Sequence, residues 1–173
     1  MWLKCVGCLL IIVAGSALGF RYANRYEERL QQIKLLTSCL TTLESYIEHV
    51  AMPLTQAFIQ IVQGLEGPIA ELFMKTALAM EHSRQLSPVD ALEENFERLK
   101  NDIRLEQPEQ ELLLLLVTKL TVINPKGHSA YFAMTLKQLQ DIEEQARQNQ
   151  AVNVKMFRYL GICGSLILVI LLL

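Results

Sequence analysis

Apolar residues in the middle of the chain recur at alternating steps of three and four positions, which is the period of an amphipathic helix. The stretch 22–52 shows this period first and contains neither proline nor glycine. Pro53 disfavours a helical conformation at Met52, so we expect one helix to break there and another to begin near Leu54. The first helix is expected to bury Ile33, Leu36, Leu40, Leu43, Ile47 and Val50.

Proline, glycine and capping residues predict where the next helices begin and end. Gly67 follows the second helix, which carries Leu65 as its last apolar position, and Pro68 opens a third. Ser87 is placed as the N-cap of a fourth helix, with Pro88 as its first residue. The fourth helix is expected to bury Val89, Leu92, Phe96 and Leu99.

Two more helices follow. Gln107 and Pro108 begin the fifth, whose run 112–117 is apolar on every face, so we expect it at the centre of a bundle with neighbours on all sides. Asn124 is expected to cap the last helix. If the last helix is unbroken over 129–173, its 45 residues extend for about 68 Å.

An uncharged segment lies near each end of the chain. Residues 5–20 and 159–173 carry no charged side chain and are long enough to cross a bilayer if flanking residues reach into the interface. The sequence therefore predicts an all-α fold, in which a helical bundle of about six helices is flanked by N- and C-terminal transmembrane helices. The expected domains are 1–20 and 159–173 in the membrane and 21–158 as the bundle.

Positive charges next to these segments predict the topology. Arg21, Arg25 and Arg29 follow the first segment, and Lys155 and Arg158 precede the second. Because positively charged flanks stay in the cytoplasm, we expect a two-pass protein of the cell membrane with a cytoplasmic bundle. The alternative for the first segment is a secretory signal that is cleaved, with the bundle exported.

Small residues spaced four apart occur in both predicted membrane segments. Gly15 and Gly19 form such a pair in the first, and Gly161 and Ser165 form one in the second. This spacing lets helix backbones approach closely, so we expect these residues to pack against each other or against a neighbouring protein.

Composition and motifs limit the kinds of partner and functional site that the sequence can be expected to have. The 173 residues have a net charge of −2, which argues against nucleic acid as a partner. The histidines and the four cysteines show no metal-ligand, nucleophile or disulfide pattern. We therefore expect no catalytic residue, no cofactor and no metal, with solvent-facing or capping roles for His49, His82 and His128. The charged residues Glu93, Glu94, Glu97, Arg98 and Lys100 are expected to form a solvated helix face.

Several short motifs resemble the stage III sporulation protein AB family of endospore-forming bacteria. The first helix carries Tyr26-x-x-Arg29-x-x-Gln32-Ile33 and Leu43-Glu44-x-x-Ile47, and Pro53-Leu54-x-x-Ala57 follows. The last helix carries Asn153-Val-Lys155-Met156-Phe157-Arg158-Tyr159-Leu160-Gly161, with Gly164 after it. The resemblance spans nearly the whole chain.

This resemblance implies a function that the residues alone do not give. It implies a fold related to the F-domain of type II secretion systems, and a non-enzymatic platform in the inner membrane beneath a channel between mother cell and forespore. The implied location is the mother cell side of the forespore membrane. The expected partners are the secretion-type ATPase called stage III sporulation protein AA, other channel components and further copies of the chain.

Four residues are candidates for contact with partners: Arg29, Glu44, Asn153 and Lys155. Arg29 and Glu44 could instead form salt bridges within the protein, and Lys155 could be an interfacial anchor. A membrane-tethered helical adaptor or sensor unrelated to secretion is the alternative function.

Overall fold

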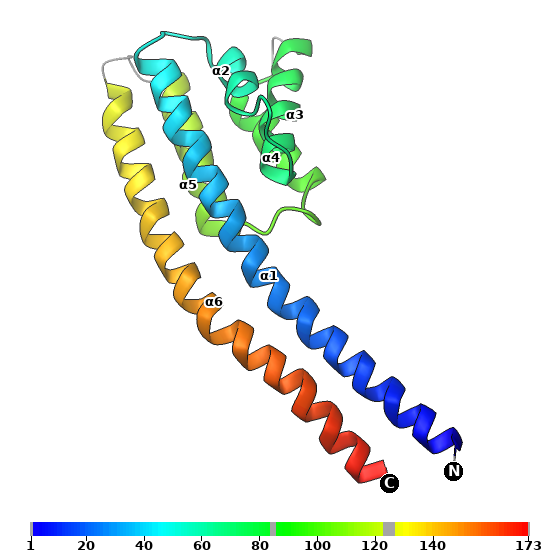
Figure 1. Cartoon of the computed structure of the whole chain (residues 1–173). Coiled ribbons are helices and arrows are strands. Elements are labelled where there is room, and N and C mark those ends of the chain that lie inside the picture. The colour runs from blue at the N-terminus through cyan, green and yellow to red at the C-terminus, as the bar shows by residue number, and fades with distance from the viewer. Residues whose placement is uncertain (1, 84–85, 123–126, 173) are drawn as a thin grey trace. The chain divides into compact units, whose positions relative to one another are not determined.

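The computed structural model describes residues 2–83, 86–122 and 127–172, without most side chains of 2–19 and 155–172. Over these residues the chain forms six α-helices and no strand, which confirms the expected all-α class (Figure 1). The helices are α1 (Trp2–Glu48), α2 (Leu54–Ile61), α3 (Pro68–His82), α4 (Pro88–Arg98), α5 (Gln107–Val122) and α6 (His128–Leu172).

The chain divides into two compact units, which we describe separately. The bundle unit comprises Gln31–Glu143, and the terminal unit comprises Met1–Leu30 with Glu144–Leu173. The domain boundaries expected at 20 and 158 follow the charge pattern of the sequence and stay a prediction.

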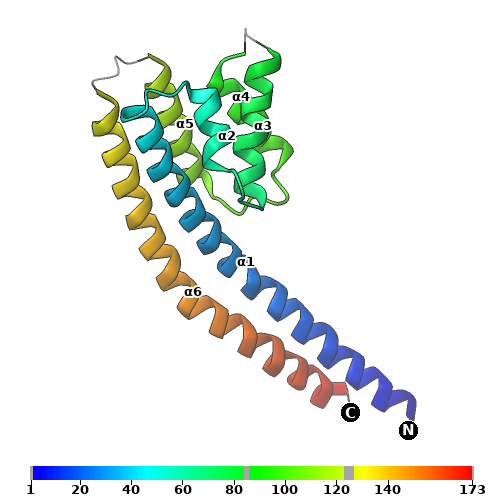
Figure 2. The same cartoon turned by 45° about the horizontal axis from the view of Figure 1, so that its top comes forward.

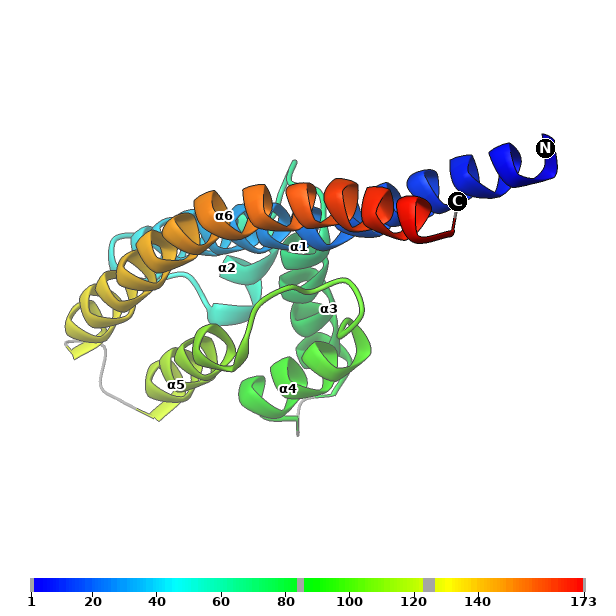
Figure 3. The same ribbon diagram turned by 90° about the horizontal axis from the view of Figure 1, so that it is seen from below.

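In the bundle unit, α3 lies between α2 and α4, and α4 packs in turn against α5 (Figures 2 and 3). Phe58 of α2 and Phe73 of α3 are fully buried, with ring centroids 5.1 Å apart and ring planes tilted by 58°. This tilted arrangement is favourable for aromatic pairs, and it fixes α2 on α3. The core also takes in Ile33, Leu36, Leu40, Leu43, Ile69, Leu72, Leu92, Leu113, Leu116 and Phe132.

Helix α4 starts where its capping serine and the proline after it predicted. The Ser87 hydroxyl oxygen accepts a hydrogen bond from the Val89 N–H at 3.3 Å, and Pro88 is the first helical residue. Ala91, Leu92 and Phe96 then face the core. The cap therefore satisfies one of the N–H groups that the first helical turn leaves without a partner.

Two helix ends differ from the expectation. Helix α1 ends at Glu48, and Ala51 turns the chain with a φ of 53°, so Val50 is 58% exposed rather than buried. Helix α2 ends at Ile61, which leaves Leu65 beyond it and 41% exposed. In both places the apolar period continues past the point where the backbone leaves the helix.

The expectation for 112–117 is wrong in one respect. Leu113, Leu116 and Val117 are buried, but Leu115 is 44% exposed and Leu112 is half-buried. Helix α5 is therefore covered on one side by the described part of the bundle unit and is open on the other. Asn124, the expected cap of α6, lies outside the described residues.

In the terminal unit, the first part of α1 and the last part of α6 lie side by side, and their outer ends are at the same end of the unit (Figures 1 and 2). Ala23 and Leu30 of α1 are buried, as are Ala146 and Val154 of α6. The backbone of α1 is helical through residues 21–26. Among the residues that the structure describes, no helix meets the length and apolarity that a membrane crossing needs, so transmembrane helices at 1–20 and 159–173 are not confirmed.

Candidate interaction surfaces

No metal centre is found within the described ranges, where no group of three or more histidine, cysteine and acidic side chains could hold an ion. His49 is exposed, and His82 Nδ1 hydrogen-bonds the Leu78 carbonyl at 2.9 Å near the end of α3, as expected of a capping residue. His128 is 7% exposed as the first residue of α6, so of the two roles expected for it the solvent-facing one is wrong and the capping one stays a prediction.

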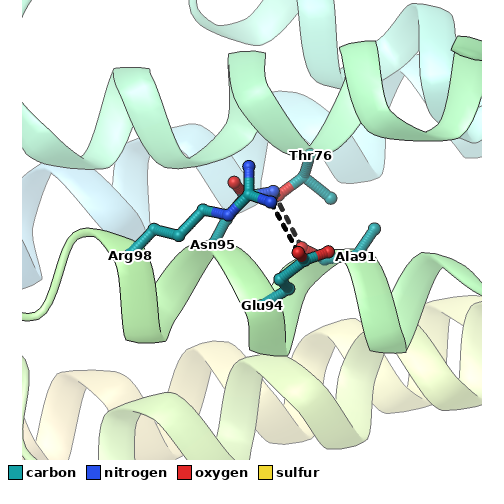
Figure 4. A network of polar contacts seen from close by, with 5 residues as sticks. All are labelled: Thr76, Ala91, Glu94, Asn95 and Arg98. Atoms are coloured by element: carbon teal, nitrogen blue, oxygen red, sulfur yellow. Dashed lines mark hydrogen bonds and ion pairs between the residues drawn. The ribbon is translucent and has the colours of Figure 1, made fainter.

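The outward side of α4 is a charged surface, as predicted. Arg98 pairs with Glu94 at 2.6 Å (Figure 4). Lys100 pairs with Glu97 at 3.4 Å, and all four side chains are exposed. Exposed pairs of this kind contribute little stability, because water screens them. This surface is built to face water.

The inward side of α4 holds a polar contact to α3. The Asn95 side-chain amide is 3% exposed and donates to the Ala91 carbonyl at 2.8 Å, with Thr76 Oγ1 at 3.5 Å (Figure 4). Thr76 Oγ1 itself donates to the Leu72 carbonyl at 2.7 Å. Asn95 therefore lies in the core with its amide group satisfied, as a buried amide requires.

Gln32 of α1 fastens the connection between α4 and α5. Its Nε2 donates to the Asp102 carbonyl at 2.9 Å, and its Oε1 accepts from the Arg104 N–H at 2.6 Å. The side chain is 9% exposed. Sequence reasoning gave Gln32 no role beyond its place in a motif, although a glutamine next to the buried Ile33 on an apolar face was a signal that could have been used.

The outward side of α5 is apolar. Pro108, Leu112, Leu115, Lys119 and Val122 follow one another at steps of four, three, four and three residues, so they share one face of the helix. Leu115 is 44% and Val122 is 78% exposed. These five residues define what we call the open face of α5.

A groove runs along the open face of α5 at its first half. It has a volume of about 440 Å³ and is lined by Pro108, Glu111, Leu112 and Leu115 of α5 and by Gln138, Asp141 and Ile142 of α6. Glu111 and Asp141 make this end of the face acidic. Towards the other end of the open face, the Lys119 ammonium lies 5.7 Å from the centre of the Tyr131 ring. This cation–π contact holds Lys119 close to the open face of α5.

Glu44 lies half-buried on α1 in the bundle unit. Burial raises the pKa of its carboxyl group, the negative charge of Glu48 raises it further, and His49 opposes the rise. Within 2–83, 86–122 and 127–172, Glu44 makes no ion pair, so the salt bridge considered for it is not seen there.

The other candidates fall in the terminal unit. Arg29 is half-buried and has an interaction partner, and Asn153 is half-buried on α6. The side chains of Lys155, Gly15, Gly19, Gly161 and Ser165 lie outside the described residues. The structure thus puts Arg29 and Asn153 in one unit and Glu44 in the other, and the contact and packing roles of all these residues stay predictions.

Comparison with known proteins identifies the family. The sequence profile described as stage III sporulation protein AB matches residues 4–173. Stage III sporulation protein AB of Bacillus subtilis (strain 168) is 31% identical over 170 residues, which are 98% of this chain and 99% of that protein.

A solved structure of a stage III sporulation protein AB superposes with a TM-score of 0.66 at 26% identity, over 72% of this chain and 98% of that chain. The sequence and structural matches agree with each other. The chain therefore belongs to the stage III sporulation protein AB family and has a role in the sporulation apparatus.

Proposed function

We propose that the protein is a non-enzymatic platform of the inner membrane in a secretion-like channel between mother cell and forespore. It couples a cytoplasmic ATPase to the membrane part of that channel. The observation that carries the proposal is the continuity of α1 and α6. Each runs as one helix from the bundle unit through a long segment without charged side chains, 5–20 in α1 and 159–172 in α6. A continuous helix can transmit a displacement along its length, whereas a flexible linker absorbs it.

The membrane part of the proposal concerns residues 1–20 and 159–173. A helix satisfies its own backbone hydrogen bonds and can therefore cross a bilayer. Gly15, Gly19, Gly161 and Ser165 then allow the two segments to pack closely, or to pack against other channel components. The positive flanks keep the bundle unit in the cytoplasm, on the mother cell side of the forespore membrane.

The partner of the bundle unit is the secretion-type ATPase stage III sporulation protein AA. Glu44 is a candidate contact in the bundle unit, and Arg29, Asn153 and Lys155 are candidates nearer to the membrane. A platform beneath a channel also requires several copies of the chain, so self-association belongs to the proposal.

Topology is tested first, because it decides whether the ATPase can reach the bundle. A full-length variant without native cysteines receives one cysteine by Asp90→Cys or Asn101→Cys, both at exposed positions. Growing cells that produce it are treated with an impermeant thiol reagent before or after the membrane is opened. Labelling only after opening supports the proposal, and labelling of intact cells contradicts it, favouring the exported protein with a cleaved signal.

Partner choice is tested by purification from the membrane. The tagged full-length chain is solubilised in detergent and mixed with purified stage III sporulation protein AA, and retention of the ATPase is measured. Glu44→Lys should reduce retention, whereas Glu93→Lys, on the charged side of α4, should not. A correctly oriented protein that retains no ATPase would favour the adaptor or sensor function.

A further inference from the structure

The open face of α5 has the symmetry needed to pair with itself. Leu115 lies at its centre, with Pro108 and Val122 seven residues before and after it. On the flanks of this face, Glu111 and Lys119 lie four residues before and after Leu115, and Leu112 and Thr118 lie three residues before and after it. When two identical helices cross antiparallel about a two-fold axis at Leu115, each residue lies at the height of its matched partner on the other helix. The two acidic ends then meet the two basic ends.

Each matched pair is chemically compatible. Pro108 and Val122 are apolar, and Leu112 meets Thr118, whose hydroxyl already donates to the Leu114 carbonyl at 2.8 Å and so needs no other partner. Leu115, 44% exposed, meets its own copy. The pairing therefore covers apolar surface without burying a polar group that has lost its hydrogen bond.

We propose that a second copy of this chain docks on the open face of α5, antiparallel and with the two-fold axis at Leu115. Glu111 of each copy then faces Lys119 of the partner subunit. Charge favours this occupant, because the exposed Glu111 and Asp141 make one end of the face acidic and α5 itself carries the basic Lys119 towards the other end. The ion pairs fix the direction and register of the two helices, and the apolar residues provide the contact area.

A contact made by one helix from each subunit is smaller than the roughly 800 Å² per partner of stable dimers. We therefore expect it to be weak in dilute solution and to form where copies are held together, because attachment to one membrane raises their effective concentration. The inference rests on the self-association in the proposed function and is independent of the ATPase.

Symmetry gives the contact a specific test. In the full-length chain without native cysteines, the single substitution Leu115→Cys places two thiols at the axis, within reach of a short bifunctional thiol reagent across paired helices about 8–10 Å apart. Leu78→Cys on α3 is the matched control, since Leu78 is 42% exposed against 44% for Leu115. In membranes, we expect about tenfold more covalent dimer from Leu115→Cys than from Leu78→Cys.

Charge substitutions test the direction of the pairing. Glu111→Lys and Lys119→Glu, each added to Leu115→Cys, should lower the dimer yield roughly fivefold because like charges then face each other. The double variant restores opposite charges and should recover most of the yield. Recovery by the double variant is not expected from a merely structural effect of either residue, including the loss of the Lys119–Tyr131 contact.

Equal cross-linking of Leu115→Cys and Leu78→Cys would overturn the inference, and so would an adduct of Leu115→Cys to a different protein. Co-purification of two differently tagged copies from the same membranes separates the possible failures. If the copies co-purify while Leu115→Cys gives no dimer, the chain associates through another surface. If they do not co-purify, the proposed self-association fails as well.

Discussion

Helices α4 and α5 pack against each other, but their outward faces differ. Outside, α4 carries exposed ion pairs such as Glu94 with Arg98, while α5 carries Leu115 and Val122. The inward faces of both helices are mostly apolar with one buried polar side chain each, Asn95 on α4 and Glu109 on α5, so they do not distinguish the two helices. The outward faces therefore distinguish the two helices: that of α4 suits contact with water, and that of α5 suits contact with another protein.

The largest effect should come from the buried side of α5. Leu113 is fully buried, and Leu113→Ala should lower the free energy of unfolding by about 3–4 kcal/mol, through lost burial and the cavity left behind. Leu115→Ala removes the same atoms from the open face and should cost less than about 1 kcal/mol in dilute detergent solution. Urea unfolding followed by circular dichroism measures both, and equal losses would mean that α5 is covered on both sides.

The contrast between α4 and α5 also shows what could be predicted from the sequence. Ser87 and Pro88 placed the start of α4 correctly, because capping is a local interaction. The run 112–117 was placed at the centre of the bundle, because apolar residues require cover and the simplest source is the same chain. Periodicity does not say whether a neighbour belongs to the chain or to a partner, so the open face of α5 could not be predicted.

A second prediction concerns the connection that holds α5 beside α4. Gln32→Ala should cost about 2 kcal/mol, because the Asp102 carbonyl and the Arg104 N–H both lose their partner near the interior. Gln32→Glu keeps an acceptor for Arg104 but loses the donor to Asp102, so its loss should be intermediate. Gln31→Ala changes the exposed neighbour and is the control. A loss for Gln31→Ala as large as that for Gln32→Ala would contradict this account.

Long-range contacts such as those of Gln32 could not be predicted from the sequence. The partners of Gln32 lie 70 and 72 residues further along the chain, a separation at which spacing carries no information. The candidate contacts Arg29, Glu44 and Asn153 came from motifs, which identify positions but not the surface on which they lie. Val50 and Leu65 were assigned to buried faces because a regular period does not reveal where the backbone turns.

The third prediction tests the start of α4. Ser87→Ala should destabilise the protein by about 1 kcal/mol, because the Val89 N–H loses its acceptor. Ser87→Asp keeps an acceptor at the positive end of the helix and should stay within about 0.5 kcal/mol of the original protein. Thermal unfolding followed by circular dichroism suffices, and a loss for Ser87→Asp equal to that for Ser87→Ala would show that the loss does not come from the missing acceptor.

The smallest effect should come from the outward face of α4. Arg98→Ala breaks the pair with Glu94, whose side chains are 64% and 53% exposed, and should cost about 0.3–0.5 kcal/mol, less at high salt. The same substitution should leave the Leu115→Cys dimer yield unchanged, because Arg98 lies on α4 and not on the open face of α5. Glu111→Lys should behave in the opposite way, with little change in unfolding and a clear change in dimer yield. If Arg98→Ala altered the dimer yield as much as Glu111→Lys, the charged face of α4 would be part of the contact, and the two helices would no longer differ in what they face.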